Sequence, residues 1–349
     1  MKKLIAAAVA SSMTAFAMAD ISITGDAKYE YDLNDNNGAK TATANTEAHI
    51  NFTGKSGDTT FVAKFQLVER GTDGEVAAQA AGAAGAKVDA TSVDGDFDME
   101  DTYITTTIAG VGVKAGNYAS SNAALAGEIE DGGRSHGKVT MSYKLGDVSL
   151  YAGNGGSAST NTGADQGINN NMFAGASTTV NGQTIHVKKN SDERDSFGIK
   201  GSVGGVNYRY EAIDDNGAAS TITAGEADYV ELSTTVSGLT VQYARLDADN
   251  ATLLTENDSA VFAIEAGGIS GSTGQDQIAV STTVDGNKVT LKNGSVEKAL
   301  SSNTKDQDYT QLSVSRALSS GATAVVTYTD KDLATGDHQN LEIELNVKF

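Results

Sequence analysis

Five acidic side chains lie within eight positions, a grouping that could bind a metal ion. They are Asp94, Asp96, Asp98, Glu100 and Asp101. Carboxylate oxygens are the ligands that Ca²⁺ and Mg²⁺ prefer, so the segment is a candidate divalent-cation site. It is not an EF-hand, because Met99 occupies the position where that loop requires glycine. The alternative is a solvated acidic loop whose charges repel one another.

Three other patterns match chemical motifs only in their spacing. Residues 110–115 fit a dinucleotide-binding glycine pattern, but a strand is expected to follow, so no helix N-terminus is available for a pyrophosphate. Ser135 and Lys138 have the spacing of a penicillin-binding nucleophile motif, whose other elements are absent. The four histidines are too scattered for a zinc site or a catalytic triad. They are His49, His136, His186 and His338. We therefore expect no enzymatic activity.

The N-terminal residues have the pattern of an export signal. Lys2 and Lys3 precede an apolar stretch at 4–10, and residues 17–19 supply the small-x-small pattern that a signal peptidase accepts. We expect a signal peptide at 1–19 and a single mature domain at 20–349. Loss of the two lysines takes the formal net charge from −20 to −22. Without cysteine, neither a disulfide nor a thiolate metal site is possible.

The mature sequence alternates with a period of two, which is typical of β-strands. Residues 21–31 place apolar, small and aromatic side chains on one face and polar side chains on the other. After the leader, no apolar run approaches the roughly 20 residues that a spanning helix needs. If the chain spans a membrane, it must do so as a closed barrel. The same alternation recurs at 61–67, 139–143, 197–199, 206–210, 239–243 and 322–328.

Short and long connections follow one another along the chain. We expect tight turns at Ser56-Gly57-Asp58, Ala109-Gly110, Gly146-Asp147, Gly204-Gly205, Ser237-Gly238, Asp285-Gly286-Asn287 and Ser319-Ser320-Gly321. Long polar segments lie between them, at 32–45, 70–100, 117–134, 154–192, 212–226, 248–274, 296–306 and 331–338. These fifteen connections predict an all-β, transmembrane antiparallel barrel of about sixteen strands, with short periplasmic turns and long extracellular loops. A soluble sandwich or β-solenoid explains the alternation of turn lengths less well.

The C-terminal strand carries a more specific pattern. Residues 341–349 alternate apolar with polar side chains and end on Phe349. This resembles the assembly signal of bacterial outer-membrane barrels, which implies recognition by the barrel-assembly machinery. The alternative is an ordinary edge strand that happens to end in phenylalanine.

Two further segments resemble the general porins, a family of trimeric, sixteen-stranded outer-membrane barrels from Gram-negative bacteria. Residues 103–117 are similar to that family's fourth strand, tight turn and fifth strand, with Asn117 where arginine is often found. Residues 315–319 are similar to the segment before the penultimate strand, without its tyrosine. The resemblance implies a homotrimer in the outer membrane, with a water-filled channel for passive diffusion of ions and small hydrophilic solutes.

In the general porins, the third long loop folds into the barrel and places acidic residues opposite basic residues of the wall. The corresponding segment here is 117–134, which is short for that role. Its acidic candidates are Glu128, Glu130 and Asp131. The basic candidates are Lys64, Arg70, Lys114, Arg134 and Lys138. Lys138 is placed inside most securely, because Val139, Met141 and Tyr143 would take the lipid side. Each of these charges could equally be a solvated group without a special role.

Three functions remain open: a passive channel, a substrate-selective channel of the same architecture, and a non-conducting barrel for adhesion or envelope structure. The net charge predicts that cations permeate better than anions, unless the basic candidates control the narrowest point. Expected partners are membrane lipid, lipopolysaccharide and further copies of the chain, with no nucleic acid. No cofactor is expected beyond Ca²⁺ or Mg²⁺ at residues 94–101, where an ion could bridge to lipopolysaccharide phosphates or to a neighbouring subunit.

Overall fold

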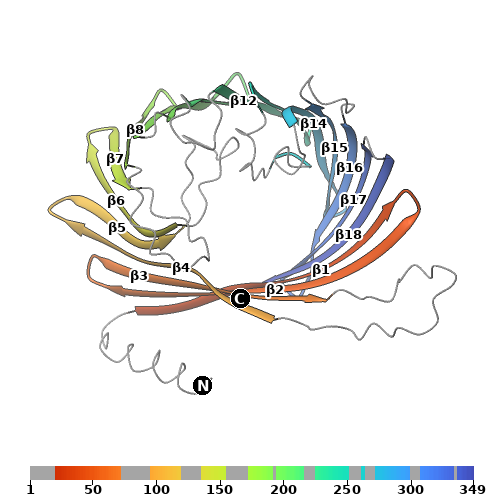
Figure 1. The fold of residues 1–349 in the computed structure, drawn as a ribbon, viewed down its shortest axis with the longest axis horizontal. Coiled ribbons are helices and arrows are strands. Elements are labelled where there is room, and N and C mark those ends of the chain that lie inside the picture. Colours follow the sequence, from red (N-terminus) through yellow and green to blue (C-terminus); the bar gives the residue numbers. More distant parts are fainter. Residues whose placement is uncertain are drawn as a thin grey trace, which may run out of the picture.

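The computed structural model shows eighteen β-strands joined into one closed antiparallel barrel (Figure 1). The residues it describes are 20–71, 95–118, 135–154, 172–191, 194–215, 225–250, 261–263, 272–298, 307–333 and 336–349, so the expected leader lies outside them. The strands are β1 (Asp20–Asn36), β2 (Ala39–Ser56), β3 (Thr59–Gly71), β4 (Gly95–Ile108), β5 (Val111–Tyr118), β6 (Ser135–Leu145), β7 (Val148–Asn154), β8 (Met172–Val180), β9 (Gln183–Asn190), β10 (Arg194–Val203), β11 (Val206–Asp215), β12 (Gly225–Val236), β13 (Leu239–Ala248), β14 (Ser272–Val284), β15 (Asn287–Lys298), β16 (Gln307–Ala317), β17 (Ala322–Leu333) and β18 (Gly336–Lys348).

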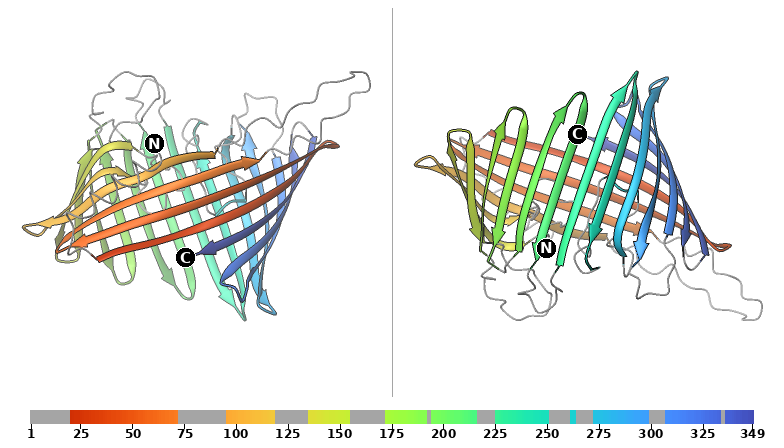
Figure 2. Two further views of the ribbon diagram at one scale, coloured as in Figure 1. Left: turned by 90° about the horizontal axis from the view of Figure 1, so that it is seen from below. Right: turned by 90° about the horizontal axis from the view of Figure 1, so that it is seen from above.

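The sheet closes between its first and last strands. β1 pairs with β2 on one side and with β18 on the other, and every other strand pairs with its two neighbours in sequence. In the closing pair, Asp26 is opposite Lys348 and Asn36 is opposite His338. The strands run obliquely around the barrel (Figure 2). Closure removes the unpaired N–H and C=O groups of an edge strand, as a sheet surrounded by hydrocarbon requires.

The expected number of about sixteen strands is wrong, because the segment 154–192 contains two strands rather than one long loop. These are β8 and β9, which form a hairpin around Asn181 and Gly182. Asn181 has φ +50° and Gly182 has φ +78°, the backbone of a two-residue turn that asparagine and glycine tolerate. On the outer face of β8, the small side chains of Ala174 and Ala176 separate Met172 from Val180, so the apolar alternation is weak in the sequence.

The expected segregation of connections by length holds only in part, because β1–β2, β9–β10 and β17–β18, at the end expected to carry long loops, are joined by two or three residues. All seven expected tight turns form, and together with the turn at 181–182 they lie at the barrel end where β1 starts and β18 finishes. Two segments expected to be long loops, 32–45 and 331–338, are instead mostly strand. Asn37 and Gly38 make the turn between β1 and β2, with φ +51° and φ +86°, the backbone of a two-residue turn that asparagine and glycine tolerate. The central parts of the other long segments lie outside the described residues, apart from 261–263.

The two faces of the wall differ in polarity. On β6, Val139, Met141 and Tyr143 are 40%, 48% and 46% exposed, whereas Lys138 is 3% exposed. Successive side chains of a strand point to opposite sides, so the apolar set faces outward and Lys138 faces the lumen. Large apolar side chains are exposed around the barrel in the same way. Within the described ranges, no helix is both long and apolar enough to cross a membrane.

Candidate functional site

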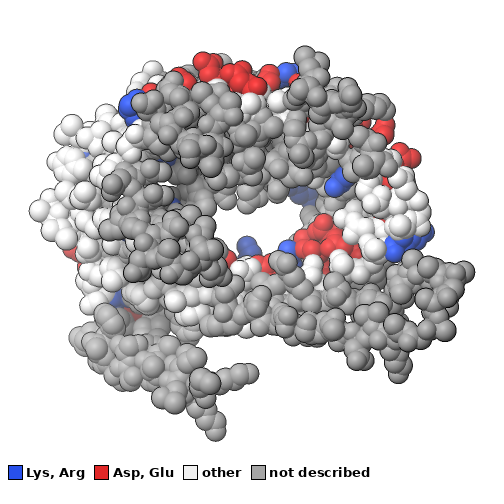
Figure 3. Space-filling view, in the orientation of Figure 1, with Lys and Arg blue, Asp and Glu red and all other residues white. Residues whose placement is uncertain are grey.

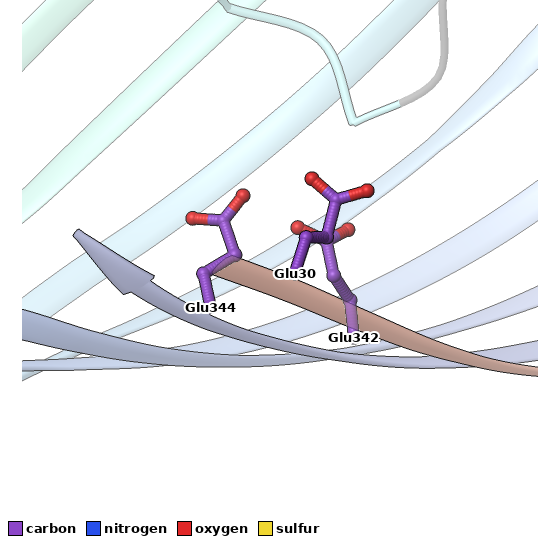
Figure 4. A group of neighbouring side chains, drawn as sticks. All are labelled: Glu30, Glu342 and Glu344. Carbon is purple, nitrogen blue, oxygen red and sulfur yellow. The ribbon is translucent and has the colours of Figure 1, made fainter. Parts of the chain in front are cut away.

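Three glutamates from the first and last strands bring their carboxylates together inside the barrel (Figure 4). Oxygens of Glu30 on β1 and of Glu342 and Glu344 on β18 all lie within 4.8 Å of one another. The register of the closing pair is the cause, because Glu30 is opposite Glu344 and Asp32 is opposite Glu342. We call Glu30, Asp32, Glu342 and Glu344 the acidic seam. Figure 3 shows carboxylates gathered beside the opening, on the side where Figure 1 places β1 and β18.

One lysine offsets part of the charge of the acidic seam. Lys28 Nζ lies 2.7 Å from Glu30 Oε2 and 3.8 Å from Glu47 Oε2. In the part of the chain that the structure describes, no lysine or arginine forms an ion pair with the other three seam residues. The seam therefore keeps an excess of carboxylates on the lumen face.

The acidic surface continues along the lumen wall to β4. His49 Nδ1 lies 3.0 Å from Asp26 Oδ2, and His49 Nε2 lies 2.9 Å from Glu47 Oε1. Lys64 Nζ lies 2.6 Å from Glu100 Oε2. A register shift after Lys64 in the β3–β4 pairing accompanies this contact, and it brings the 6%-exposed Glu100 to the same face as Lys64 and His49. We call Asp26, Glu47, Glu100 and the acidic seam together the acidic wall.

The acidic run at 94–101 was expected in a loop, but most of it lies in β4. Glu100 is paired with Lys64, while Met99 beside it is 59% exposed on the outer face. Asp101 is opposite Lys64 in the strand register, and Asp94 lies outside the described residues. Asp96 and Asp98 are described only as strand residues. Cation binding by these residues stays a prediction.

Two of the predicted basic residues lie close together on β5 and β6, the strands that follow β4 around the lumen wall. Lys114 Nζ is 3.9 Å from the ring centroids of both Tyr103 and Tyr118. Lys138 Nζ donates a hydrogen bond to the Tyr118 carbonyl oxygen at 3.4 Å. The register places Lys114 opposite Thr140, on the same face as Lys138. Cation–π contacts therefore hold Lys114 against the wall.

The other candidates are placed less fully. Arg70 belongs to the last residues of β3, where only the backbone is described. Arg134 and the acidic candidates Glu128, Glu130 and Asp131 lie outside the described residues, as does nearly all of the segment expected to narrow the pore.

Further lumen residues were missed because they belong to the unrecognised hairpin and its neighbours. Tyr151 and His186 form a hydrogen bond between the phenol oxygen and Nε2, and Lys188 Nζ lies 5.3 Å from the centroid of Phe173. A concave site of about 410 Å³ follows toward the tight-turn end. Its lumen-facing lining is Thr184, Lys200, Asn207, Arg209, Glu231 and Ser233. Strand parity from Lys138 onward would have predicted this orientation once the hairpin was known.

A short segment between β13 and β14 also lies inside the barrel. Phe262 is 5% exposed, and its ring centroid is 6.2 Å from that of Tyr229 in an edge-to-face arrangement. Tyr229 shares the lumen face with Glu231, whereas Leu232 is 42% exposed on the outer face. Residues 261–263 therefore lie against the lumen wall, although the sequence had pointed to 117–134 as the inward-folding segment.

A closed antiparallel barrel with an apolar outer face and a charged lumen defines the class of transmembrane β-barrels. No protein-family model and no curated protein matches the sequence. Among solved structures, the chain is similar to Pseudomonas aeruginosa OccK9 (OpdG), with a TM-score of 0.65, 12% identity, and coverage of 95% of this chain and 99% of that one. It is similar to OccK2 (OpdF) in complex with glucuronate, with a TM-score of 0.64, 11% identity, and coverage of 95% and 98%.

A third similar structure is P. aeruginosa OpdK with vanillate, with a TM-score of 0.64, 11% identity, and coverage of 95% of this chain and 99% of that one. At such identities the likeness establishes the barrel fold over almost the whole chain. The expected match to a sixteen-stranded general porin is corrected, because eighteen strands form and the similar structures are Occ and Opd proteins.

Proposed function

We propose that this protein is an outer-membrane channel for the passive diffusion of ions and small hydrophilic solutes. The observation that carries the proposal is the charged inner face of a closed barrel whose outer face is apolar. A barrel of this strand number leaves an aqueous lumen unless loops fill it. The Occ and Opd neighbours are outer-membrane channels, which supports the same location and a channel role in place of an enzymatic one. Conductance steps in a planar bilayer test this proposal, and their absence would contradict it.

Within this proposal, the acidic wall gives the channel a preference for cations. Unpaired carboxylates of the seam raise the local cation concentration in the lumen. The reversal potential across a KCl gradient measures this preference. The double variant E342Q/E344Q should lower the cation-to-anion permeability ratio several-fold. D308N is a matched control, because Asp308 is an exposed carboxylate on the outer face of β16. An unchanged ratio in the double variant would remove the seam as the cause.

A second candidate function is a substrate-selective channel for small organic anions. The concave site near the tight-turn end favours it, because its lumen-facing lining holds two cationic side chains, Arg209 beside Glu231 and Lys200, which forms no ion pair within the described residues. Thr184, Asn207 and Ser233 add hydrogen-bonding groups to the same lining. Two of the similar structures hold glucuronate and vanillate, which both carry a carboxylate.

Liposome swelling separates the two candidates. A selective channel should admit glucuronate faster than glucose, and K200Q should remove the difference while K189Q leaves it intact. Lys189 is the matched control, because it is an exposed lysine on the outer face that pairs with Asp195 at 2.8 Å. Equal rates for both solutes would leave passive diffusion as the function.

Homotrimer formation, recognition by the barrel-assembly machinery and contact with lipopolysaccharide also belong to the proposal. Their support is the sequence resemblance to the general porins and the aromatic end of the last strand. The lipid-facing apolar surface of the barrel is what such partners would meet.

A further inference from the structure

The segment Val261–Ala263 is fixed to the lumen wall by one glutamine side chain. Gln277 Nε2 donates a hydrogen bond to the Val261 carbonyl oxygen at 2.9 Å, and the Ala263 N–H donates to Gln277 Oε1 at 2.8 Å. The side-chain amide of Gln277 thus pairs with the backbone of Val261, before Phe262, and of Ala263, after it. Lys292 Nζ donates a second hydrogen bond to the Val261 carbonyl oxygen at 2.8 Å.

The glutamine is itself held in position. Tyr309 Oη donates to Gln277 Oε1 at 3.2 Å and accepts a hydrogen bond from Gln275 Nε2 at 3.1 Å. Gln277 is 1% exposed and Tyr309 is 2% exposed. Gly294 makes room for the phenol, since a Cβ atom there would lie 2.6 Å from Tyr309 Oη. The Gln277 amide therefore keeps one orientation, so its hydrogen bonding to residues 261–263 costs little conformational entropy.

Phe262 occupies an apolar patch that has no other role in a polar lumen. The buried residues around it, contributed by β11, β12 and β13, are Ile213, Ala227, Tyr229, Ala244, Leu246 and Ala248. Leu246 and Tyr229 are completely buried, and Val261 packs against the same cluster. Apolar side chains on the inner face of a water-filled barrel favour being covered, and Phe262 covers these.

We propose that Phe262 and Gln277 are positioning residues that fix residues 261–263 against the lumen wall and thereby narrow the cross-section of the channel. This inference rests on the proposed channel function and deepens it. The docked segment lies on the wall formed by β11 to β15, whereas the acidic seam belongs to β18 and β1. Permeating ions pass between the docked segment and the acidic wall.

Single-channel conductance of the full-length protein tests the proposal. F262A should raise the conductance about twofold and add rapid current fluctuations, because residues 261–263 are no longer held to the wall. F262L keeps an apolar side chain of similar size and should restore a conductance close to the original. F197A is the matched control, because Phe197 is 38% exposed on the outer face of β10.

A second variant keeps the test decisive. Q277L removes both hydrogen bonds to the segment without touching Phe262, and it should raise the conductance in the same direction. Loss of the heat-modifiable band shift on gels would show that F262A does not fold. In that case the conductance of Q277L alone tests the positioning role. Unchanged conductance in Q277L and in any folded F262A overturns the positioning role while leaving the channel function intact. A wild-type protein without conductance would instead overturn the proposed function.

Discussion

Phe349 and Gly25 close the barrel through a reciprocal pair of backbone hydrogen bonds. The Phe349 N–H donates to the Gly25 carbonyl oxygen at 2.9 Å, and the Gly25 N–H donates to the Phe349 carbonyl oxygen at 2.8 Å. The phenyl ring also covers Gly25 on the outer face, where a Cβ atom would lie 2.6 Å from Phe349 Cζ. The missing side chain of Gly25 therefore provides the space that the aromatic ring occupies.

G25A should destabilise the closed barrel by roughly 1–3 kcal/mol, because the added methyl group overlaps the ring of Phe349 and the His49 carbonyl oxygen. Urea unfolding in detergent micelles, followed by the gel band shift, measures the change. G54A is the control, since a Cβ atom at Gly54 meets nothing within 4 Å. Equal midpoints for the two variants would contradict the packing argument.

Deletion of Phe349 should lower the amount of protein in the outer membrane several-fold. The deletion removes the two backbone hydrogen bonds between Phe349 and Gly25, and it uncovers Gly25 on the outer face. Immunoblots of isolated outer membranes provide the measurement. F61A removes another exposed aromatic ring of the outer face but leaves the closure intact, so it should accumulate normally. Normal levels of the deletion variant would count against Phe349 as an assembly signal.

The protein should migrate as a heat-labile trimer in mild detergent. Samples kept at room temperature and boiled samples are compared on gels, with chemical cross-linking as an independent measure of subunit number. A monomer under all of these conditions would end the homotrimer proposal. It would have no bearing on the barrel itself, whose strand pairing is complete within one chain.

K138E should increase the preference for cations, because it replaces a lumen cation by a carboxylate beside Tyr118. The increase should be large in 0.1 M KCl and small in 1 M KCl, since the screening length falls from about 10 Å to about 3 Å. Reversal potentials at the two salt concentrations measure the effect. K189E is the control, because its charge change is on the outer face. A response of the same size in K189E would mean that overall charge, not the lumen wall, sets the preference.

The fold was predictable from the sequence where its patterns are local. Residues 139–143 have a strict alternation, which correctly placed Lys138 in the lumen. The hairpin at 172–190 was missed even though Asn181-Gly182 is a strong turn signal, because its small alanines gave no clear apolar face. Residues 32–45 were taken for a loop because polar side chains predominate on both faces of this hairpin.

The candidate site was less predictable because it depends on contacts between distant residues. The acidic seam exists only when Glu30 and Glu344 are brought opposite each other by closure of the barrel. The docking of Phe262 requires side chains from three strands, β11, β12 and β13, and a segment that follows the last of them. No spacing along the chain encodes either arrangement.

The pairing of β1 with β18 also constrains the order of events in folding. Each strand between them can pair with the strand that follows it in sequence as soon as both have formed. The β1–β18 ladder, in which Asp26 is opposite Lys348, can form only after the last strand is in place. Bringing together segments so far apart carries a large entropic cost, and folds with such high contact order form slowly. Until that step is complete, both terminal strands present unpaired backbone groups. The closing step is therefore the one at which the chain is most exposed to aggregation.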